Sequence, residues 1–389
     1  MIVRFEVKTY FNIMKTVKQF FLGLTVVLFA SCSGDSEEEL IGNWVRTGVN
    51  EFGGAERAYA ATFVIDGKGY VCAGRNGFRY PDGGFGRRDM WVGTPTGENG
   101  RCSWVETPDS LPDGKGRFQA VGFSVNGKGY VGAGWNGDEN VMRDFWEYDP
   151  TKSGQPDAWR EIAPLPGVAR YNATAFVLKG VAYVIGGQTR GADKAYLQDF
   201  WKFNPPSDAE PDGSWTRMEI TTGKRAGAST FVIDDEWVYY CLGQNSSGPV
   251  YEFQRFNGTE WDDLRPMRSY NSDDDYDDDY GYDLERYDAV AFTLKGTGTS
   301  YKGYITAGTK ATTWEYEPPV KSGGVLISGD IWTKRTGFRA RQGAFALSFP
   351  GLGAGGDNLV LTGTGVESSN YREDLWIFRP EDEHTTNDD

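Results

Sequence analysis

The sequence predicts an all-β fold, a six-bladed β-propeller whose ring is closed by an N-terminal strand. Three observations predict it. One block of sequence occurs six times, each copy contains short strand patterns separated by turn signals, and the strand missing after the last copy is present before the first. No segment shows a sustained helical period. Because one four-stranded sheet cannot bury both of its faces, six such sheets are expected to pack around a common axis.

The repeat is clearest in a seven-residue block. "DFWEYDP" at residues 144–150 returns as "DFWKFNP" at 199–205, and related blocks begin at Asp89, Glu252, Thr312 and Asp374. A second shared block, which opens Arg-x-x-Ala, precedes each copy. Its six arginines are Arg57, Arg117, Arg170, Arg225, Arg286 and Arg341. A repeat of this length is the sequence signature of propeller blades.

Each unit contains four strand patterns. "FVIDGKGYV" places two apolar runs on either side of Asp66-Gly67, a dipeptide that accepts positive φ and closes a tight hairpin. A polar loop follows, then the Asp-x-Trp strand, then a turn and a strand containing a further Trp. The block "DFWEYDP" is therefore expected to be the third strand of a blade.

The ends of the chain predict how the ring closes. The sixth copy ends at Pro380 with no Trp strand after it, whereas "NWVRTG" at 43–48 precedes the first copy. Trp44 is expected to supply the outermost strand of the sixth blade, which removes the exposed sheet edges. Eleven of the thirteen Trp then lie at repeat positions.

These units resemble kelch repeats over about residues 42–381. The family's double glycine after strand two is kept only at Gly186-Gly187. The resemblance implies a propeller and extends distantly to galactose oxidase and to the bacterial N-acetylneuraminate epimerases. A galactose oxidase copper site needs paired His ligands, and His384 is the single His of this chain. The epimerases exchange sugar anomers with only an acid and a base, which makes a cofactor-free sugar mutarotase the enzymatic alternative.

The N-terminus resembles a bacterial lipoprotein signal peptide. Residues 1–31 contain a basic segment and a short apolar stretch, Met14 is an alternative start, and Cys32 follows Ala30-Ser31. The resemblance implies a lipid on Cys32, an acidic tether over 32–41 and attachment to the outer membrane. The tether "SGDSEEE" is similar to export tags of surface lipoproteins of the Bacteroidetes type. An ordinary cleaved signal and a periplasm-facing anchor remain alternatives, and residues 382–389 are expected to be a disordered tail.

The net charge limits the kinds of partner. The formal charge of −15 argues against a nucleic-acid partner.

Cys72, Cys102 and Cys241 are expected to be buried free thiols, because Cys72 and Cys241 occupy the same position in opposite blades. A Cys72–Cys102 bridge remains open.

The loops that follow strands two and four should share one face of the propeller, called here the loop-rich face. The six arginines of the Arg-x-x-Ala blocks are expected there, around the mouth of the channel, where they would bind an acidic ligand. In some kelch domains, arginines at corresponding positions bind acidic peptides. The alternative is structural: each arginine pairs with an acid of its blade, such as Asp144 or Asp199.

The residues after the strand-two glycines are further candidates for ligand binding. They are Arg75, Trp135, Gln188 and Gln244. Trp135 would stack on a sugar ring, with packing inside the loop as the alternative. Asp275, Asp277 and Asp279 alternate like the start of a calcium loop, but Tyr280 and Arg286 break that pattern, and a solvated acidic loop is the alternative. No other cofactor is expected.

Together, these observations favour a monomeric, lipid-anchored envelope protein that binds a glycan or protein ligand at the loop-rich face. The alternatives are the sugar mutarotase and a scaffold for another envelope protein.

Overall fold

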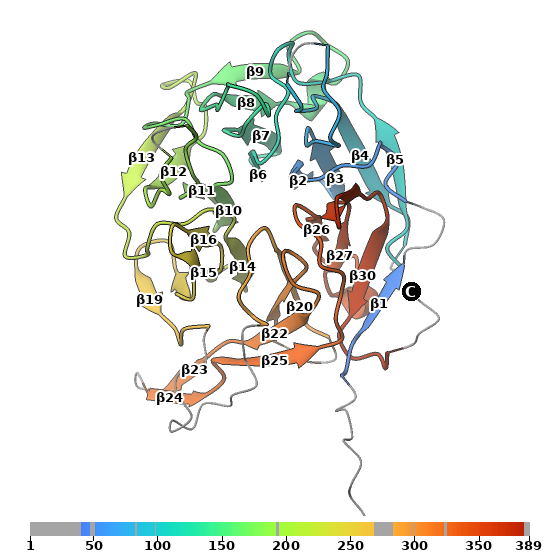
Figure 1. The fold of residues 1–389 in the computed structure, drawn as a ribbon, viewed down its shortest axis with the longest axis vertical. Helices are drawn as coiled ribbons and strands as arrows, with labels where there is room; N and C mark the ends of the chain where they lie inside the picture. Colours follow the sequence, from blue (N-terminus) through green and yellow to red (C-terminus); the bar gives the residue numbers. More distant parts are fainter. Residues whose placement is uncertain are drawn as a thin grey trace, which may run out of the picture. The chain divides into compact units, whose positions relative to one another are not determined.

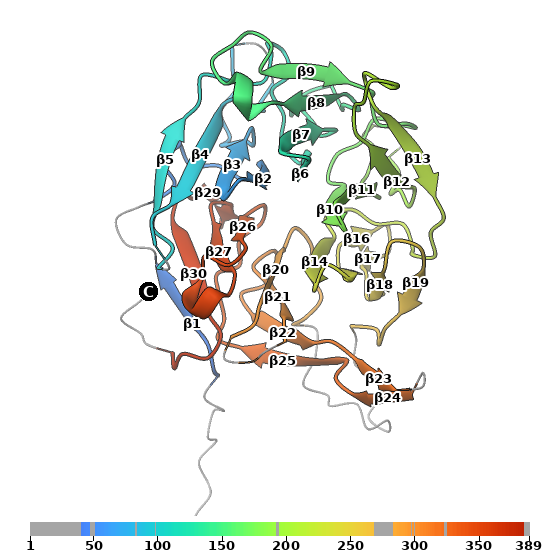
Figure 2. The same ribbon diagram turned by 180° about the vertical axis from the view of Figure 1, so that it is seen from behind.

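Six four-stranded antiparallel sheets surround a central axis, which confirms the predicted all-β propeller (Figures 1 and 2). The structure is a computed structural model. It describes residues 40–46, 51–81, 84–97, 99–191, 194–267, 283–296, 298, 300–322 and 325–384. None of these residues forms an α-helix, and none lies in a helix long and apolar enough to cross a membrane.

The innermost strand of each blade is its first strand in sequence. Blade one consists of β2 (Ala61–Ile65), β3 (Lys68–Cys72), β4 (Met90–Pro95) and β5 (Cys102–Glu106). Blade two consists of β6 (Val121–Val125), β7 (Lys128–Gly132), β8 (Phe145–Tyr148) and β9 (Trp159–Ile162). Blade three consists of β10 (Thr174–Leu178), β11 (Val181–Ile185), β12 (Phe200–Asn204) and β13 (Ser214–Met218). Blade four consists of β14 (Ser229–Ile233), β15 (Trp237–Cys241), β18 (Gln254–Phe256) and β19 (Trp261–Asp263). Blade five consists of β20 (Val290–Leu294), β21 (Lys302–Thr306), β22 (Thr313–Glu317) and β25 (Ile331–Arg335). Blade six consists of β26 (Phe345–Phe349), β27 (Leu359–Gly363), β30 (Leu375–Arg379) and β1 (Asn43–Arg46).

Smaller elements lie in the connections between strands. They are the ribbons β16 (Gln244–Asn245) with β17 (Gly248–Pro249), β23 (Val320–Ser322) with β24 (Val325–Ser328) and β28 (Val366–Glu367) with β29 (Asn370–Tyr371), and the 3-10 turns at Pro150–Lys152 and Ala354–Gly356. The β23–β24 hairpin projects from blade five and exposes Val325 and Ile327, each at 64%.

The N-terminal strand closes the ring as the sequence predicts. β1 pairs antiparallel with β30, and Trp44 lies opposite Phe378. Trp44 is buried, and its indole Nε1 donates to Thr313 Oγ1 and to the Thr336 carbonyl oxygen, both at 3.2 Å. Because both acceptors belong to blade five, the closing strand also joins blade six to its neighbour.

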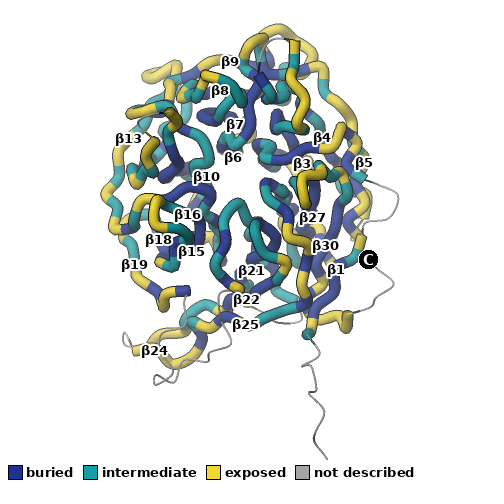
Figure 3. Tube along the Cα trace, in the orientation of Figure 1, coloured by how far each residue is buried: buried dark blue, intermediate teal, exposed yellow. Residues whose placement is uncertain are grey.

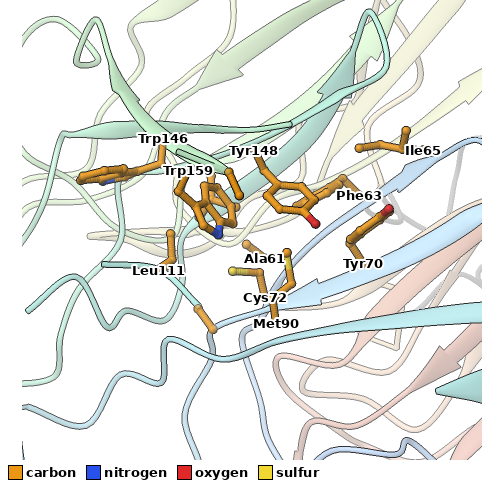
Figure 4. Close-up of a cluster of buried hydrophobic side chains, with 13 residues drawn as sticks. Ala61, Phe63, Ile65, Tyr70, Cys72, Met90, Leu111, Trp146, Tyr148 and Trp159 are labelled. Atoms are coloured by element: carbon orange, nitrogen blue, oxygen red, sulfur yellow. The ribbon is translucent and has the colours of Figure 1, made fainter. Parts of the chain in front are cut away.

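Aromatic and aliphatic side chains fill the space between neighbouring blades. Figure 4 shows such a cluster, in which Phe63 and Tyr70 of blade one meet Trp159 of blade two. Phe63 also explains a glycine of the repeat: a Cβ at Gly129 would lie 2.3 Å from the Phe63 ring. Cys72 lies in the same cluster as a free thiol, and Cys102 and Cys241 are buried and free as well. Exposed segments gather on the connecting loops (Figure 3).

Two circles of backbone hydrogen bonds join consecutive blades on the loop-rich face. In the first circle, the third residue of each Arg-x-x-Ala block donates its N–H to the carbonyl oxygen of the equivalent residue in the preceding blade. Gln119 donates to Tyr59 at 3.1 Å, and Tyr59 donates to Gly343 at 2.7 Å, which completes the circle. All six of these residues have positive φ; they are Tyr59, Gln119, Asn172, Gly227, Asp288 and Gly343. In the second circle, a glycine after strand two donates to the carbonyl of the next blade's block arginine, as Gly74 does to Arg117 at 2.9 Å. The two circles place the third residues of the blocks around the channel mouth.

In most blades the residue before that glycine is the one that departs from the double glycine of kelch repeats. Ala73, Ala133, Leu242, Ala307 and Thr364 occupy this position in five blades, and all have positive φ. Residues with a Cβ adopt this conformation at a cost that glycine avoids. The backbone conformation of the repeat is therefore kept where its glycine is not.

Candidate functional site at the channel mouth

The six block arginines are buried inside the blades, which corrects the expectation that they form an open ring at the mouth. Their exposed fractions are 0% or 1%. In four blades the guanidinium pairs with the acid that opens strand three. The pairs are Arg57–Asp89 at 2.7 Å, Arg117–Asp144 at 3.0 Å, Arg170–Asp199 at 2.5 Å and Arg341–Asp374 at 2.7 Å. The same acids accept from the indole of the strand-three Trp, as Asp144 does from Trp146 at 2.9 Å.

The physical reason for this burial is that the guanidinium joins the two loops of the face. Arg117 donates to the carbonyl oxygens of Lys115 and Ala133, which lie on different loops, as well as to both oxygens of Asp144. Burial alone would raise the pKa of the Asp144 carboxyl, but Arg117 outweighs it and lowers that pKa to about 2. The arrangement matches the structural alternative, and these buried donors are not presented to solvent.

Blades four and five depart from the pattern. Arg225 pairs with Glu252, whose side chain is 56% exposed. In blade five Thr312 replaces the acid, and Arg286 donates to Thr312 Oγ1 (2.5 Å) and to backbone carbonyl oxygens. Burial lowers the pKa of Arg286 to about 10, although Asp283 opposes this effect. Blade five therefore buries a guanidinium that hydrogen-bonds to no carboxylate among the residues the structure describes.

The mouth itself is lined by the third residues of the blocks, none of which was among the predicted site residues. Asp288 of blade five is the centre of a group called here the mouth cluster, which consists of the third residues Asp288, Tyr59 and Asn172 and the second residue Gln342. Asp288 Oδ1 accepts from Asn172 Nδ2 at 2.8 Å, and Oδ2 accepts from Tyr59 OH and Gln342 Nε2, both at 3.3 Å. The contacts come from blades one, three and six, so one carboxyl connects side chains across the channel. All four residues are half-buried and reach solvent.

Two glycines make room for the cluster. A Cβ at Gly343 would lie 2.6 Å from the Tyr59 ring, and one at Gly227 would lie 2.4 Å from Asp288 Oδ1. Both glycines occupy the third position of their own blocks. The signal was therefore present in the sequence as one repeat position that is polar in four blades and Gly in two.

The electrostatics of the mouth cluster differ from those of the buried pairs. Burial raises the pKa of the Asp288 carboxyl, and the three neutral donors only partly offset it. Burial and then Asp288 raise the pKa of the Tyr59 hydroxyl. A carboxyl with a raised pKa beside a phenol, both half-buried, is a candidate acid–base pair. Below it, a cavity of about 250 Å³ follows the axis and is lined by the innermost strands of all six blades.

The other predicted residues lie next to the mouth, with different exposure. Arg75, Trp135, Gln188 and Gln244 form backbone bridges to the second residues of the blocks. Arg75 and Trp135 are half-buried, and so is Gln244 in its ribbon. Gln188 is 6% exposed and its buried Oε1 accepts no hydrogen bond from the described residues, so its side chain does not line an open surface.

Trp135 shows the loop packing that was the alternative to sugar stacking. Its ring lies 5.2 Å from Phe118 and 5.5 Å from Tyr171, and its Nε1 donates to the Asp138 carbonyl oxygen at 2.9 Å. The guanidinium of Arg190 lies 4.4 Å from the ring centroid. Trp135 thus belongs to a row of aromatic side chains that begins beside the mouth.

The predicted calcium ligands Asp275, Asp277 and Asp279 lie outside the described residues, as does Cys32. Among the described residues, no group of three or more His, Cys, Asp or Glu side chains is arranged to hold a metal ion.

The comparisons with known proteins agree with the fold. The Kelch motif matches residues 169–218, which include all of blade three, and the six-bladed arrangement is consistent with kelch repeats. Two relatives are N-acetylneuraminate epimerases. The one from Haemophilus influenzae (strain PittEE) is 28% identical over 148 residues, and the one from Pasteurella multocida (strain Pm70) is 25% identical over 142 residues. The matches cover 37% and 36% of this chain and span about a third of each relative, 34% and 33%. The similarity to these enzymes is distant and partial.

Proposed function

We propose that the propeller binds a carbohydrate at the channel mouth, with the mouth cluster as its polar centre. The observation that carries the proposal is Asp288, whose carboxyl accepts hydrogen bonds from three neutral side chains of three other blades and, among the described residues, from no cation. A carboxyl whose partners are amides and a phenol exchanges them readily for sugar hydroxyls, which both donate and accept hydrogen bonds. Binding sites commonly combine a few convergent polar groups with aromatic side chains, and the half-buried Tyr371 lies beside Arg75 at this mouth.

Sugar mutarotation at the same mouth is a second candidate, favoured by the raised pKa of Asp288. In this reaction the carboxylate removes the proton from the anomeric hydroxyl while an acid protonates the ring oxygen. The ring C–O bond breaks, and the open form closes again on either face. Asp288 and Tyr59 supply a base and a proton donor whose oxygens are 3.3 Å apart. The partial similarity to N-acetylneuraminate epimerases supports the choice of this reaction.

Asp288→Asn tests both candidates. It removes the charge and keeps a side chain that tolerates the positive φ of this position. The probes are N-acetylneuraminate and neutral monosaccharides, with binding measured by calorimetry and exchange between α- and β-anomers by NMR. We expect the variant to weaken binding about tenfold, the loss of about one hydrogen bond to a charged group, and to remove any catalysis of anomer exchange.

The matched control is Asp66→Asn, in the exposed hairpin turn between β2 and β3, which also has positive φ. It should leave binding and exchange unchanged. If Asp288→Asn binds and exchanges as the control does, the mouth is not the site. If binding falls but the wild type never speeds anomer exchange, the protein is a binder and not a mutarotase.

We also propose that the propeller is held at the bacterial outer membrane by a lipid on Cys32, with the mouth open to extracellular or periplasmic sugars. The signal-like residues 14–31 and the Cys32 that follows them support this proposal.

A further inference from the structure

Two arginines on the loop-rich face, Arg75 and Arg190, differ from their neighbours because they form no ion pair with a carboxylate of the residues that the structure describes. Arg79, Arg87 and Arg372 on the same face each pair with an acid, at 2.6, 2.8 and 2.9 Å. Arg75 instead donates from Nε to Tyr371 OH at 2.8 Å and lies over Phe118, and its terminal nitrogens have no hydrogen-bond partner among the described residues. Arg190 is exposed, lies over the ring of Trp135 and, within the described part of the chain, forms no hydrogen bond or ion pair.

The two arginines stand at opposite ends of one row of aromatic side chains. Arg75 lies 4.9 Å from the centroid of the Phe118 ring, Phe118 packs against Trp135, and Arg190 lies on the far side of Trp135. Arg75 also acts electrostatically on Tyr59 of the mouth cluster. Because Arg75 and Trp135 occupy the equivalent position in consecutive blades, the row follows the rim of the mouth over blades one to three.

A groove continues from the Arg190 end of this row. It has a volume of about 690 Å³ and lies between the loops of blades two and three. Val141, Val168 and Leu197 provide an apolar wall, while Arg190 and Glu139 provide the charges. Val141 bridges to Trp135, so the groove begins where the aromatic row ends.

We infer that the mouth and this groove form one extended site for an acidic oligosaccharide, a chain of sugars that carry carboxylates. Arg75 binds a carboxylate of the unit at the mouth, and Arg190 binds that of a unit further along the chain. A guanidinium binds a carboxylate through two parallel hydrogen bonds, and both arginines have donors free for them. The apolar wall contacts the non-polar faces of the sugar rings. Glu139 repels a carboxylate on its own side of the groove, which directs the acidic group toward Arg190.

This inference rests on the proposed function, because the first sugar unit occupies the same mouth. It adds that the affinity of the protein for an acidic oligosaccharide increases with the number of acidic units, and that Arg190 is responsible for this increase. Phe118 and Trp135 separate Arg75 from Arg190, so the inference assigns the two arginines to different sugar units.

The test is a length series of galacturonate oligomers of one, two and four units, titrated into the full chain by calorimetry. Neutral galactose oligomers of the same lengths serve as the uncharged series. We expect affinity for the acidic series to rise at least tenfold from one to four units and the neutral series to rise less. Arg190→Ala should remove the rise and leave binding of the single unit unchanged, whereas Arg75→Ala should weaken every acidic probe.

Two further variants sharpen the result. Glu139→Gln should strengthen binding of the four-unit acid, and Arg217→Ala, an exposed arginine of β13, should change nothing. Affinity that does not depend on length, or a rise that survives Arg190→Ala, overturns the inference. In either case, binding of a single sugar that still needs Asp288 leaves the proposed function standing. A wild type that binds no galacturonate oligomer overturns the inference, and one that also binds neither N-acetylneuraminate nor a neutral monosaccharide overturns both.

Discussion

Asp144→Ala separates the structural role of the block arginines from a role in ligand binding. Arg117 is fully buried and makes two hydrogen bonds of 3.0 Å to the Asp144 carboxylate, which also accepts from Trp146 and Lys115. Without the carboxylate, the Arg117 charge stays buried with only the carbonyl oxygens of Lys115 and Ala133. Removing one partner of a buried pair costs about 3–5 kcal/mol.

The pKa of Asp144 provides a second measure of the same interaction. Its fall from 3.8 to about 2 corresponds to about 2 kcal/mol in favour of the ionised form. The pKa gives the smaller value and the loss of a buried partner the larger one, so the expected loss is about 2–5 kcal/mol. Because the folded pKa is depressed, this stability is present above pH 4 and is lost as the pH falls toward 2.

The assay is urea unfolding followed by tryptophan fluorescence, at several pH values between 7 and 2. The control is Asp138→Ala, which breaks the ion pair with Arg79. Those two side chains are 42% and 57% exposed, so the loss should stay under about 1 kcal/mol. The difference in unfolding free energy between wild type and Asp144→Ala should narrow as the pH approaches 2. A variant as stable as the control that has nevertheless lost ligand binding would refute the structural role and return Arg117 to the ligand site.

Three further predictions follow from the ring and its anchor. Deleting residues 40–48 removes β1, exposes β30 and should cause aggregation or a large fall in melting temperature; unchanged melting would show that β1 does not hold the ring closed. Thr312→Asp should stabilise blade five by about 1–3 kcal/mol in urea unfolding, because it gives Arg286 the carboxylate partner that the block arginines of the other five blades have, and a loss of stability would show that this blade cannot accept the acid. Cys32→Ala should stop incorporation of labelled fatty acid and release the protein from the membrane fraction, whereas labelling at the wild-type level would rule out a lipid on Cys32.

The repeat explains why so much of the fold could be predicted. Each copy spells the same strand lengths, the same hairpin turn and the same inward side chains, and copies that cannot bury their faces alone have few ways to pack. Trp44 illustrates this point, because its position before the first copy was sufficient to predict the strand that completes blade six.

The chemistry of the mouth could not be predicted in the same way. A repeat shows what its copies share, and the six shared arginines turned out to be framework, buried against Asp89, Asp144, Asp199 and Asp374. Asp288 stands at a position where the copies differ, and its partners come from blades that are distant in sequence.

The sequence by itself determined the six blades, the closing strand and the loop-rich face, because these depend on local periodicity and on counting. Only the tertiary structure decided which polar side chains share the mouth. That choice depends on the ring closing, which brings Tyr59, Asn172, Asp288 and Gln342 to one axis and buries the arginines where two loops of a blade meet.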